Sequence, residues 1–304
     1  MKIKFTFLFF LFLQMNSIYA QQEAQYSQYM YNTISVNPAY AGSRNVLSVL
    51  ALHRSQWIGF EGAPKTSTFS INTPIPETNL GLGISAISDR IGPTEQTTLS
   101  GDISYTILLN EKTKLSFGAK GTASFFSFDQ YKVTPFQAND PKWRSLSSNV
   151  SPNFGVGLFL HSDQYYLGLS VPNLMESSFY NDNDIAINSQ SRNYYFIGGY
   201  VFDVSNSIKF KPAVVSKIVT GAPLQLDLSG NAMFMNKFVL GAAYRWAAAA
   251  SGLAGFQVND ALFIGYSYDF DTTSLSRYNY GSHEVFIRYE FVYKKDKLVS
   301  PRFF

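Results

Sequence analysis

The sequence has no cysteine and little charge, and each absence excludes a class of protein. Without Cys, neither a disulfide-stapled domain nor a thiolate metal site is possible. Charged residues make up 15% of the 304 residues, whereas soluble globular domains average about 25%. A formal charge of +3 without clustered Lys or Arg gives no nucleic-acid signature. The 27 Phe and 20 Tyr exclude a disordered chain and indicate surroundings less polar than water.

The residue types that usually carry catalysis are scattered along the chain. His53, His161 and His283 lie far apart, and no G-x-S-x-G elbow accompanies them. Residues 81–86 match G-x-G-x-x-A but open no helix, so we interpret Gly81 and Gly83 as strand glycines that a neighbour approaches closely. We therefore expect no enzyme activity and no cofactor.

Metal-ligand spacing of His, Asp and Glu is absent as well. One loop has enough oxygen-bearing side chains for Ca²⁺, and the alternative is that it is simply a hydrated polar loop. These side chains are Glu176, Asn181, Asp182, Asn183 and Asp184.

Residues 1–20 have the pattern of a secretory signal peptide. Lys2 and Lys4 precede an apolar stretch over residues 5–13, and Ala20 suits the position before the cleavage site. The apolar stretch is far shorter than the ~20 residues that span a bilayer as a helix. Removing both lysines lowers the formal charge from +3 to +1, so the basic balance identifies no partner.

Alternation of apolar and polar residues with a period of two dominates the rest of the chain. In residues 99–109, for example, Leu99, Ile103 and Tyr105 share one face while Ser100 and Asp102 share the other. The pattern predicts about fourteen strands, of which the first, second and eighth alternate poorly. They lie near 46–57, 65–73, 80–90, 96–109, 113–128, 150–161, 164–172, 191–203, 207–220, 223–235, 237–246, 252–257, 261–270 and 281–293.

These strands predict an all-β chain that forms an antiparallel up-and-down transmembrane barrel. An even strand number and longer loops alternating with short turns are typical of bacterial outer-membrane barrels. Pairs such as Tyr244 with Trp246 and Tyr266 with Tyr268 suit the aromatic girdles at the interfaces. The alternative is a soluble β-sandwich, but most segments exceed the usual globular strand length of about 5–6 residues.

The face predicted to line the lumen has charges of both signs, which indicates pairing across a narrow or plugged interior more than an ion-selective ring. These residues are Asp102, Lys114, Lys120, Lys209, Lys211, Lys217, Asp227, Arg245, Asp269, Glu284, Arg288 and Glu290.

The sequence thus divides into a signal peptide (1–20), an N-terminal segment (21–44), a barrel (45–293) and a periplasmic tail (294–304). The segment before the barrel is polar and rich in Tyr. Three interpretations stay open for it: a plug inside the lumen, a periplasmic contact, or a partly ordered tail.

Short motifs at both ends of the chain resemble the PorP/SprF family. They are QYSQYM at 25–30, NPAYAGS at 37–43, RSQW at 54–57, GSHE at 281–284 and SPRFF at 300–304. The residues that carry the resemblance are Asn37, Pro38, Tyr40, Gly42, Arg54, Trp57, Gly281, His283 and Glu284.

The resemblance implies an outer-membrane component of the type IX secretion system of Bacteroidota. Family members help export or anchor surface proteins, including gliding adhesins, through a C-terminal targeting domain, and some are linked to a periplasmic ring. We therefore expect a non-enzymatic barrel whose partners are outer-membrane lipid, a secreted protein with such a domain and periplasmic ring components. The alternatives are a passive channel for small solutes and, less favoured, a barrel-embedded hydrolase or acyltransferase.

Large aromatic and Arg side chains dominate protein interfaces, so those in the longer outer loops are the candidate docking residues. They are Trp57, Phe60, Trp143, Arg144, Tyr180, Arg277, Tyr278 and Tyr280. For each of them the alternative is a role in the interface girdle or in loop packing.

Overall fold

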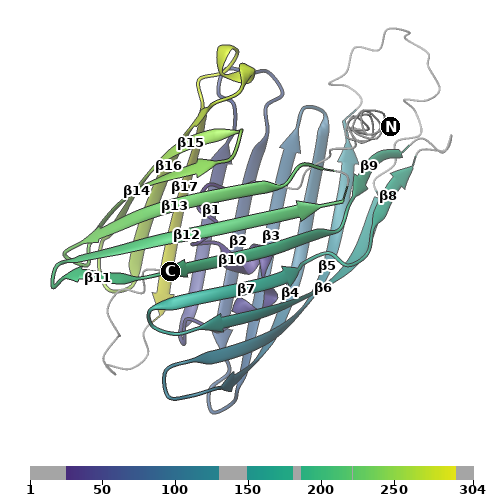
Figure 1. The fold of residues 1–304 in the computed structure, drawn as a ribbon. Helices are drawn as coiled ribbons and strands as arrows, with labels where there is room; N and C mark the ends of the chain where they lie inside the picture. Colours follow the sequence, from purple (N-terminus) through teal and green to yellow (C-terminus); the bar gives the residue numbers. More distant parts are fainter. Residues whose placement is uncertain (1–24, 130–148, 181–185, 221, 292–304) are drawn as a thin grey trace, which may run out of the picture.

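A computed structural model describes residues 25–129, 149–180, 186–220 and 222–291, and within them fourteen antiparallel strands close into one barrel (Figure 1). The chain closes the barrel where β10 pairs with β12 and where β1 pairs with β17. The strands of the wall are β1 (Leu47–Ser55), β2 (Lys65–Pro74), β3 (Leu80–Ile91), β4 (Thr94–Leu108), β5 (Lys114–Phe128), β6 (Asn149–His161), β7 (Tyr165–Val171), β10 (Asn193–Tyr200), β12 (Ile208–Val219), β13 (Gln225–Phe234), β14 (Phe238–Arg245), β15 (Ala249–Gln257), β16 (Leu262–Asp271) and β17 (Ser282–Phe291).

The predicted fold is confirmed, and each of the fourteen predicted segments overlaps one of these strands. Three short strands were not predicted. β11 (Phe202–Ser205) follows β10 and pairs with β12, while β8 (Ser177–Tyr180) and β9 (Ala186–Gln190) form a hairpin apart from the wall. β15 begins earlier than predicted because Ala247, at φ 54°, completes the preceding turn within 246–248 and frees the alanines that follow for pairing.

The barrel has two unlike ends. Short connections join the strands at the end where β1 begins and β17 ends, which we call the terminal end. The opposite end, called the loop end, has the longer connections 56–64 and 272–281, and the connections that include 130–148 and 181–185. In bacterial outer-membrane barrels with an even strand number, the terminal end faces the periplasm and the loop end faces outward.

The apolar rows point away from the barrel axis, as the alternation predicts. Leu99 and Ile103 on β4 are each 47% exposed, and Phe117 on β5 is 45% exposed. The aromatic pair Tyr244 and Trp246 near the loop end is exposed too. In a bilayer these rows contact lipid, while the closed hydrogen-bond ladder leaves the wall without an unpaired edge.

Helices are few and short in the described residues: α2 (Thr33–Val36), η1 (Pro38–Tyr40) and η4 (Ser274–Arg277). None of the helices described is long and apolar enough to cross a membrane. The predicted signal peptide and C-terminal tail, and the candidate residues Trp143 and Arg144, lie outside the described residues. The same holds for four of the five proposed Ca²⁺ ligands, Asn181, Asp182, Asn183 and Asp184.

Candidate functional site

Residues 25–44, which we call the lumenal segment, run through the inside of the barrel from the loop end to the terminal end. Near the loop end, Arg245 on β14 donates to the side-chain oxygen of Gln25 at 3.2 Å. Near the terminal end, Arg44 pairs with Glu290 on β17. Most of the side chains between these points are buried. β1 then returns to the loop end as the first strand of the wall.

The terminal-end half of the segment, residues 36–44, fits against glycines in the strands of the wall. A Cβ built on Gly118 of β5 would lie 2.2 Å from the Ala39 nitrogen, and one built on Gly157 of β6 would lie 2.1 Å from Asn37 Oδ1. Such distances are too short for any side chain, so only glycine allows this approach. Gly81 likewise meets the Ala41 carbonyl, which confirms the interpretation of the G-x-G pair as strand glycines close to a neighbour.

Hydrogen bonds complete this half. Asn37 is fully buried, donates from Nδ2 to the Leu158 carbonyl at 2.9 Å and accepts from the Ala39 N–H at 3.0 Å. Ser104 and Ser170 on the wall donate to the carbonyls of Ala41 and Val36, each at 2.7 Å. The unused polar groups of a non-helical backbone are thereby paired inside the lumen.

The short helix α2 is held at its last turn by Lys120 of β5. The Lys120 ammonium donates to the carbonyls of Ile34 at 3.1 Å and Ser35 at 3.3 Å, and lies 3.4 Å from Asp102 on β4. A cation at the C-terminal carbonyls of a helix is electrostatically favourable. The neighbouring carboxylate offsets the cost of burying the ammonium.

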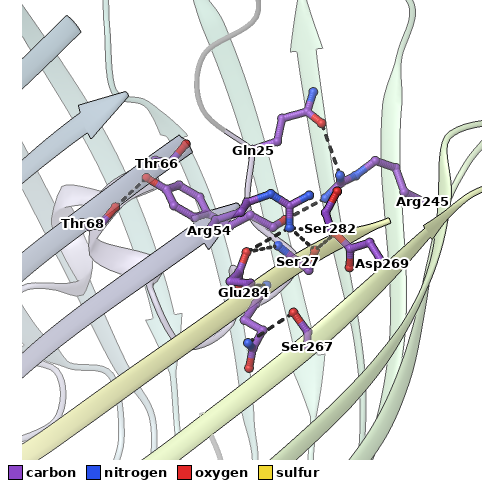
Figure 2. A network of polar contacts seen from close by, with 12 residues as sticks. Gln25, Ser27, Arg54, Thr66, Thr68, Arg245, Ser267, Asp269, Ser282 and Glu284 are labelled. Atoms are coloured by element: carbon purple, nitrogen blue, oxygen red, sulfur yellow. Dashed lines mark hydrogen bonds and ion pairs between the residues drawn. The ribbon is translucent and has the colours of Figure 1, made fainter. Parts of the chain in front are cut away.

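The loop-end half of the segment, residues 25–31, is held by a network around Arg54 of β1 (Figure 2). Arg54 Nη1 lies 2.7 Å from Asp269 of β16 and 3.2 Å from Glu284 of β17, and donates to Ser27 Oγ at 2.8 Å. Glu284 also accepts the backbone N–H groups of Ser27 and Gln28, at 2.9 and 3.0 Å. One buried cation and two buried carboxylates therefore hold the segment, Glu284 through its backbone and Arg54 and Asp269 through the Ser27 hydroxyl.

A second ion pair joins the segment to the neighbouring strands. Arg245 contacts Asp227 of β13 at 2.9 Å and donates to the Tyr26 carbonyl at 2.7 Å. The Tyr26 hydroxyl, on the other side, is 2.8 Å from Thr68 of β2. The loop-end half is thus attached to walls on both sides of the lumen.

Aromatic rings occupy the middle of the lumen. The Tyr31 ring lies 4.8 Å from that of Phe286 and 5.4 Å from that of Phe263, between centroids. Lys211 and Arg288 lie over the same ring at 5.1 and 5.6 Å, a cation–π arrangement.

The inward aromatic and aliphatic side chains were missed by reasoning from the sequence, which assigned the lumen to polar residues. Phe159, Phe263, Phe286, Leu50 and Leu52 all point inward and pack with the lumenal segment. The signal is visible in hindsight, since each belongs to a run such as Leu158-Phe159-Leu160 in which both faces of a strand are apolar. A Tyr-rich segment next to such a barrel indicates an apolar contact inside it.

The charges predicted to line the lumen do so, but several pair between neighbouring strands of the wall and not across the lumen. Asp102, Lys120, Asp269 and Glu284 are buried and engaged in the pairs described above. Lys209, by contrast, is partly exposed and lies 3.7 Å from Asp203 of β11. The inward-facing charges of opposite sign therefore neutralise one another in pairs around the lumenal segment.

The predicted docking residues fall into two groups. Trp57, Phe60, Arg277, Tyr278 and Tyr280 lie on the connections 56–64 and 272–281, which are hydrogen-bonded to each other: Ile58 donates to the Gly281 carbonyl and Tyr280 donates to the Ile58 carbonyl, each at 2.8 Å. Tyr280 is 77% exposed and Tyr278 69%. Tyr180 belongs to β8, away from this pair of connections.

The residues that carry the family resemblance gather at the same places. Asn37, Pro38 and Tyr40 are buried in the terminal-end half, and Gly42 takes a left-handed φ of 72° beside Gly81. Arg54 and Glu284 form the loop-end network. Trp57 and Gly281, at φ 48° and 81°, shape the two joined connections, and His283 faces outward, where Nδ1 lies 2.6 Å from the Tyr266 hydroxyl.

Solved structures similar to this chain are outer-membrane barrels. The P. putida toluene transporter TodX has 9% identity and a TM-score of 0.51, with 86% of this chain and 95% of that chain covered. CymD, a monoaromatic hydrocarbon channel, has 10% identity and a TM-score of 0.50, with 86% and 92% covered. At such identities the likeness shows the fold alone. No curated protein matches the sequence.

The family comparison is more informative than the structural one, because it spans both the lumenal segment and the wall. Residues 18–289 match the model of the type IX secretion system membrane protein PorP/SprF. The match includes β1 to β16, most of β17 and the nine residues that carry the resemblance, but not the SPRFF motif at 300–304. The chain therefore belongs to the PorP/SprF family of type IX secretion system membrane proteins.

Proposed function

We propose that this outer-membrane barrel docks a secreted surface protein, such as a gliding adhesin bearing a C-terminal targeting domain, at its loop end. The family assignment supports a role in type IX secretion, and the barrel fold supports a place in the outer membrane. The observation that carries the docking proposal is the aromatic surface formed by the connections 56–64 and 272–281. We call it the rim patch, made of Trp57, Phe60, Arg277, Tyr278 and Tyr280.

Rigidity favours the rim patch as a docking surface. The two backbone hydrogen bonds between Ile58 and residues 280–281 fix one connection on the other, and Trp57 donates its N–H to Ser282 at 3.1 Å. Gly59 lies against the Tyr280 ring so closely that a Cβ there would be 2.7 Å from it. Pre-ordered aromatic side chains lose little entropy on binding, which makes them effective anchors.

The proposal is tested by affinity purification from outer membranes of the producing cells. We expect the combined Phe60→Ala, Tyr278→Ala and Tyr280→Ala variant to lose the secreted proteins that co-purify with the wild type. The matched control is Tyr244→Ala with Trp246→Ala, which removes exposed aromatics near the same end of the barrel but outside the rim patch. Unchanged co-purification with the rim-patch variant would refute the docking surface.

A passive channel, the alternative expected from the sequence, has less support. The lumenal segment occupies the interior, with Tyr26, Tyr29, Ile34 and Tyr40 all at most 5% exposed. A solute path would need that segment to move. We infer that the segment closes the barrel while the loop end binds protein, and that no enzymatic step takes place.

A further inference from the structure

The wall binds the loop-end half of the lumenal segment partly through the backbone of the segment. Glu284 accepts the N–H groups of Ser27 and Gln28, and Arg245 donates to the Tyr26 carbonyl. Every peptide offers these groups, so this part of the site does not depend on which residues pass through it. Pairing of a main chain with fixed side chains is a general mode of peptide recognition.

Side-chain contacts add a preference. The Tyr26 ring packs edge-on against Tyr29 with centroids 5.5 Å apart, and its hydroxyl reaches Thr68. Ser27 is small enough for its hydroxyl to lie 2.5 Å from Asp269, and the Gln28 amide donates to Ser267 at 3.3 Å. The site therefore favours an aromatic residue followed by a small hydroxyl residue and an amide.

Charge sets a further limit on the occupant. The surrounding ion pairs contain the cations Arg54 and Arg245 and the carboxylates of Asp227, Asp269 and Glu284. Residues 25–31 themselves carry no charged side chain. An acidic peptide would add repulsion to a site that already has one more carboxylate than cations, so the site suits a neutral segment.

In the middle of the segment, the hydrogen-bonding capacity of the buried polar side chains is only partly used by the described residues. The hydroxyls of Tyr29 and Tyr31 and both amide atoms of Asn32 are buried without a hydrogen-bond partner among the described residues. A buried polar group left unpaired costs about 1–3 kcal/mol. This region contrasts with residues 37–41, whose backbone is interlocked with strand glycines and cannot leave without moving the wall.

From these contacts we propose that the loop-end half of the lumen is an exchangeable peptide-binding site that residues 25–31 occupy in cis. Its ligand in trans is an uncharged segment with an aromatic–small hydroxyl–amide pattern, able to turn after the amide residue as the cis copy does where the Tyr31 N–H donates to the Gln28 carbonyl at 3.0 Å. That the segment belongs to the secreted protein docked at the loop end rests on the proposed function. Exchange frees residues 25–31 while residues 37–44 stay anchored.

Binding of a synthetic peptide with the sequence of residues 25–31 tests the site directly. The receiver is the full-length chain with Tyr26→Ala and Gln28→Ala, which weakens the cis copy and leaves Arg54, Arg245 and Glu284 intact. In detergent, we expect saturable binding of the fluorescent peptide by polarisation, at least tenfold tighter than to wild type, in which the intact cis copy competes. A peptide with Asp in place of Ser27 should bind at least tenfold more weakly.

The matched receiver adds Glu284→Gln, and it should lose at least tenfold in peptide affinity. Resistance of the unheated barrel to SDS verifies that each variant is folded. A folded receiver that binds no peptide, or that binds equally with Glu284→Gln, overturns the proposal. These results are independent of the rim-patch purification, so the failure of one hypothesis is distinguishable from the failure of the other.

A second measurement applies to the otherwise unsubstituted chain and decides the matter where the receiver does not fold. The sequence has no Cys, so Ser27→Cys and Ser43→Cys each introduce a single thiol on a half-buried position of the lumenal segment. We expect excess peptide to raise maleimide labelling of position 27 several-fold and to leave position 43 unchanged. Equal labelling of position 27 with and without peptide would contradict exchange.

Discussion

At the scale of single residues, glycine decides where the lumenal segment can approach the wall. Gly118 and Gly121 lie on the same strand, β5, three residues apart, and have opposite surroundings. A Cβ at Gly118 would meet the backbone of Ala39 and Pro38, whereas one at Gly121 would meet nothing within 4 Å among the described residues. The two positions therefore separate the role of close approach from the role of strand flexibility.

We predict that Gly118→Ala lowers barrel stability by more than about 1 kcal/mol, because either the segment or the wall must shift. Gly121→Ala should be neutral or slightly stabilising, since glycine inside a strand is itself unfavourable. Denaturant unfolding in detergent, monitored by heat-dependent mobility on SDS gels, measures the stability of both variants. Equal stability of the two variants would show that the segment does not rest on Gly118.

The buried pair between Arg54 and Glu284 allows a second prediction at this scale. Arg54→Ala leaves two buried carboxylates, Glu284 and Asp269, without their shared cation, and loss of one partner of a buried ion pair costs about 3–5 kcal/mol. We expect Arg54→Ala to lower the free energy of unfolding by more than Arg90→Ala does. Arg90 forms an exposed ion pair with Glu95, and such a pair contributes at most about 1 kcal/mol to stability. Chemical denaturation of both variants side by side provides the comparison.

At the scale of the strand, the alternation between outward and inward faces was predictable because lipid imposes it on every residue of the wall. The apolar face of β4 could be assigned from the sequence for this reason. The inward Phe159, Phe263 and Phe286 could not, because period two places them on the polar face. Their partners lie in a segment distant in sequence, so the apolar runs around them show that both faces of the strand are apolar but not what the inner face contacts.

A charge on the outward face should reveal the depth of each position in the bilayer. Ile103→Lys places an ammonium on the outward face near the middle of β4, where the cost is about 2–4 kcal/mol. Thr97→Lys lies on the same face close to the loop end, where the cost falls to about 0–1 kcal/mol. The fraction of SDS-resistant barrel in isolated outer membranes should be reduced by the first substitution and unchanged by the second.

At the scale of the whole molecule, strand number and chain order were readable from the sequence, but the position of the N-terminal segment was not. Its polarity and its tyrosines were compatible with a plug, a periplasmic contact and a partly ordered tail. The choice depends on long-range contacts such as those of Ser27 with Asp269 and Asn37 with Leu158, which join residues far apart in sequence. The joining of the two rim connections was hidden for the same reason.

The segment inside the barrel leads to a prediction about permeability. A fourteen-strand barrel lies between the ~8 strands whose interior side chains fill and the 16–18 strands of open porins, so its closure depends on what occupies the lumen. We expect the wild-type chain in planar bilayers to give no stable conductance. Deletion of residues 25–36 removes the contacts to Glu284, Arg245 and Lys120 and should produce discrete conductance steps.

The rim-patch variant is the control for the conductance measurement. Its substitutions lie outside the lumen, so it should give no conductance, like the wild type. Steps of equal size from the wild type and from the deletion variant would mean that the lumenal segment does not close the pore, and would favour the passive channel. Absence of conductance in both would place the barrier in the anchored residues 37–44 or in the side chains of the wall. Only a difference between the two chains assigns closure to residues 25–36, the portion of the segment that precedes the glycine-bound anchor at residues 37–44.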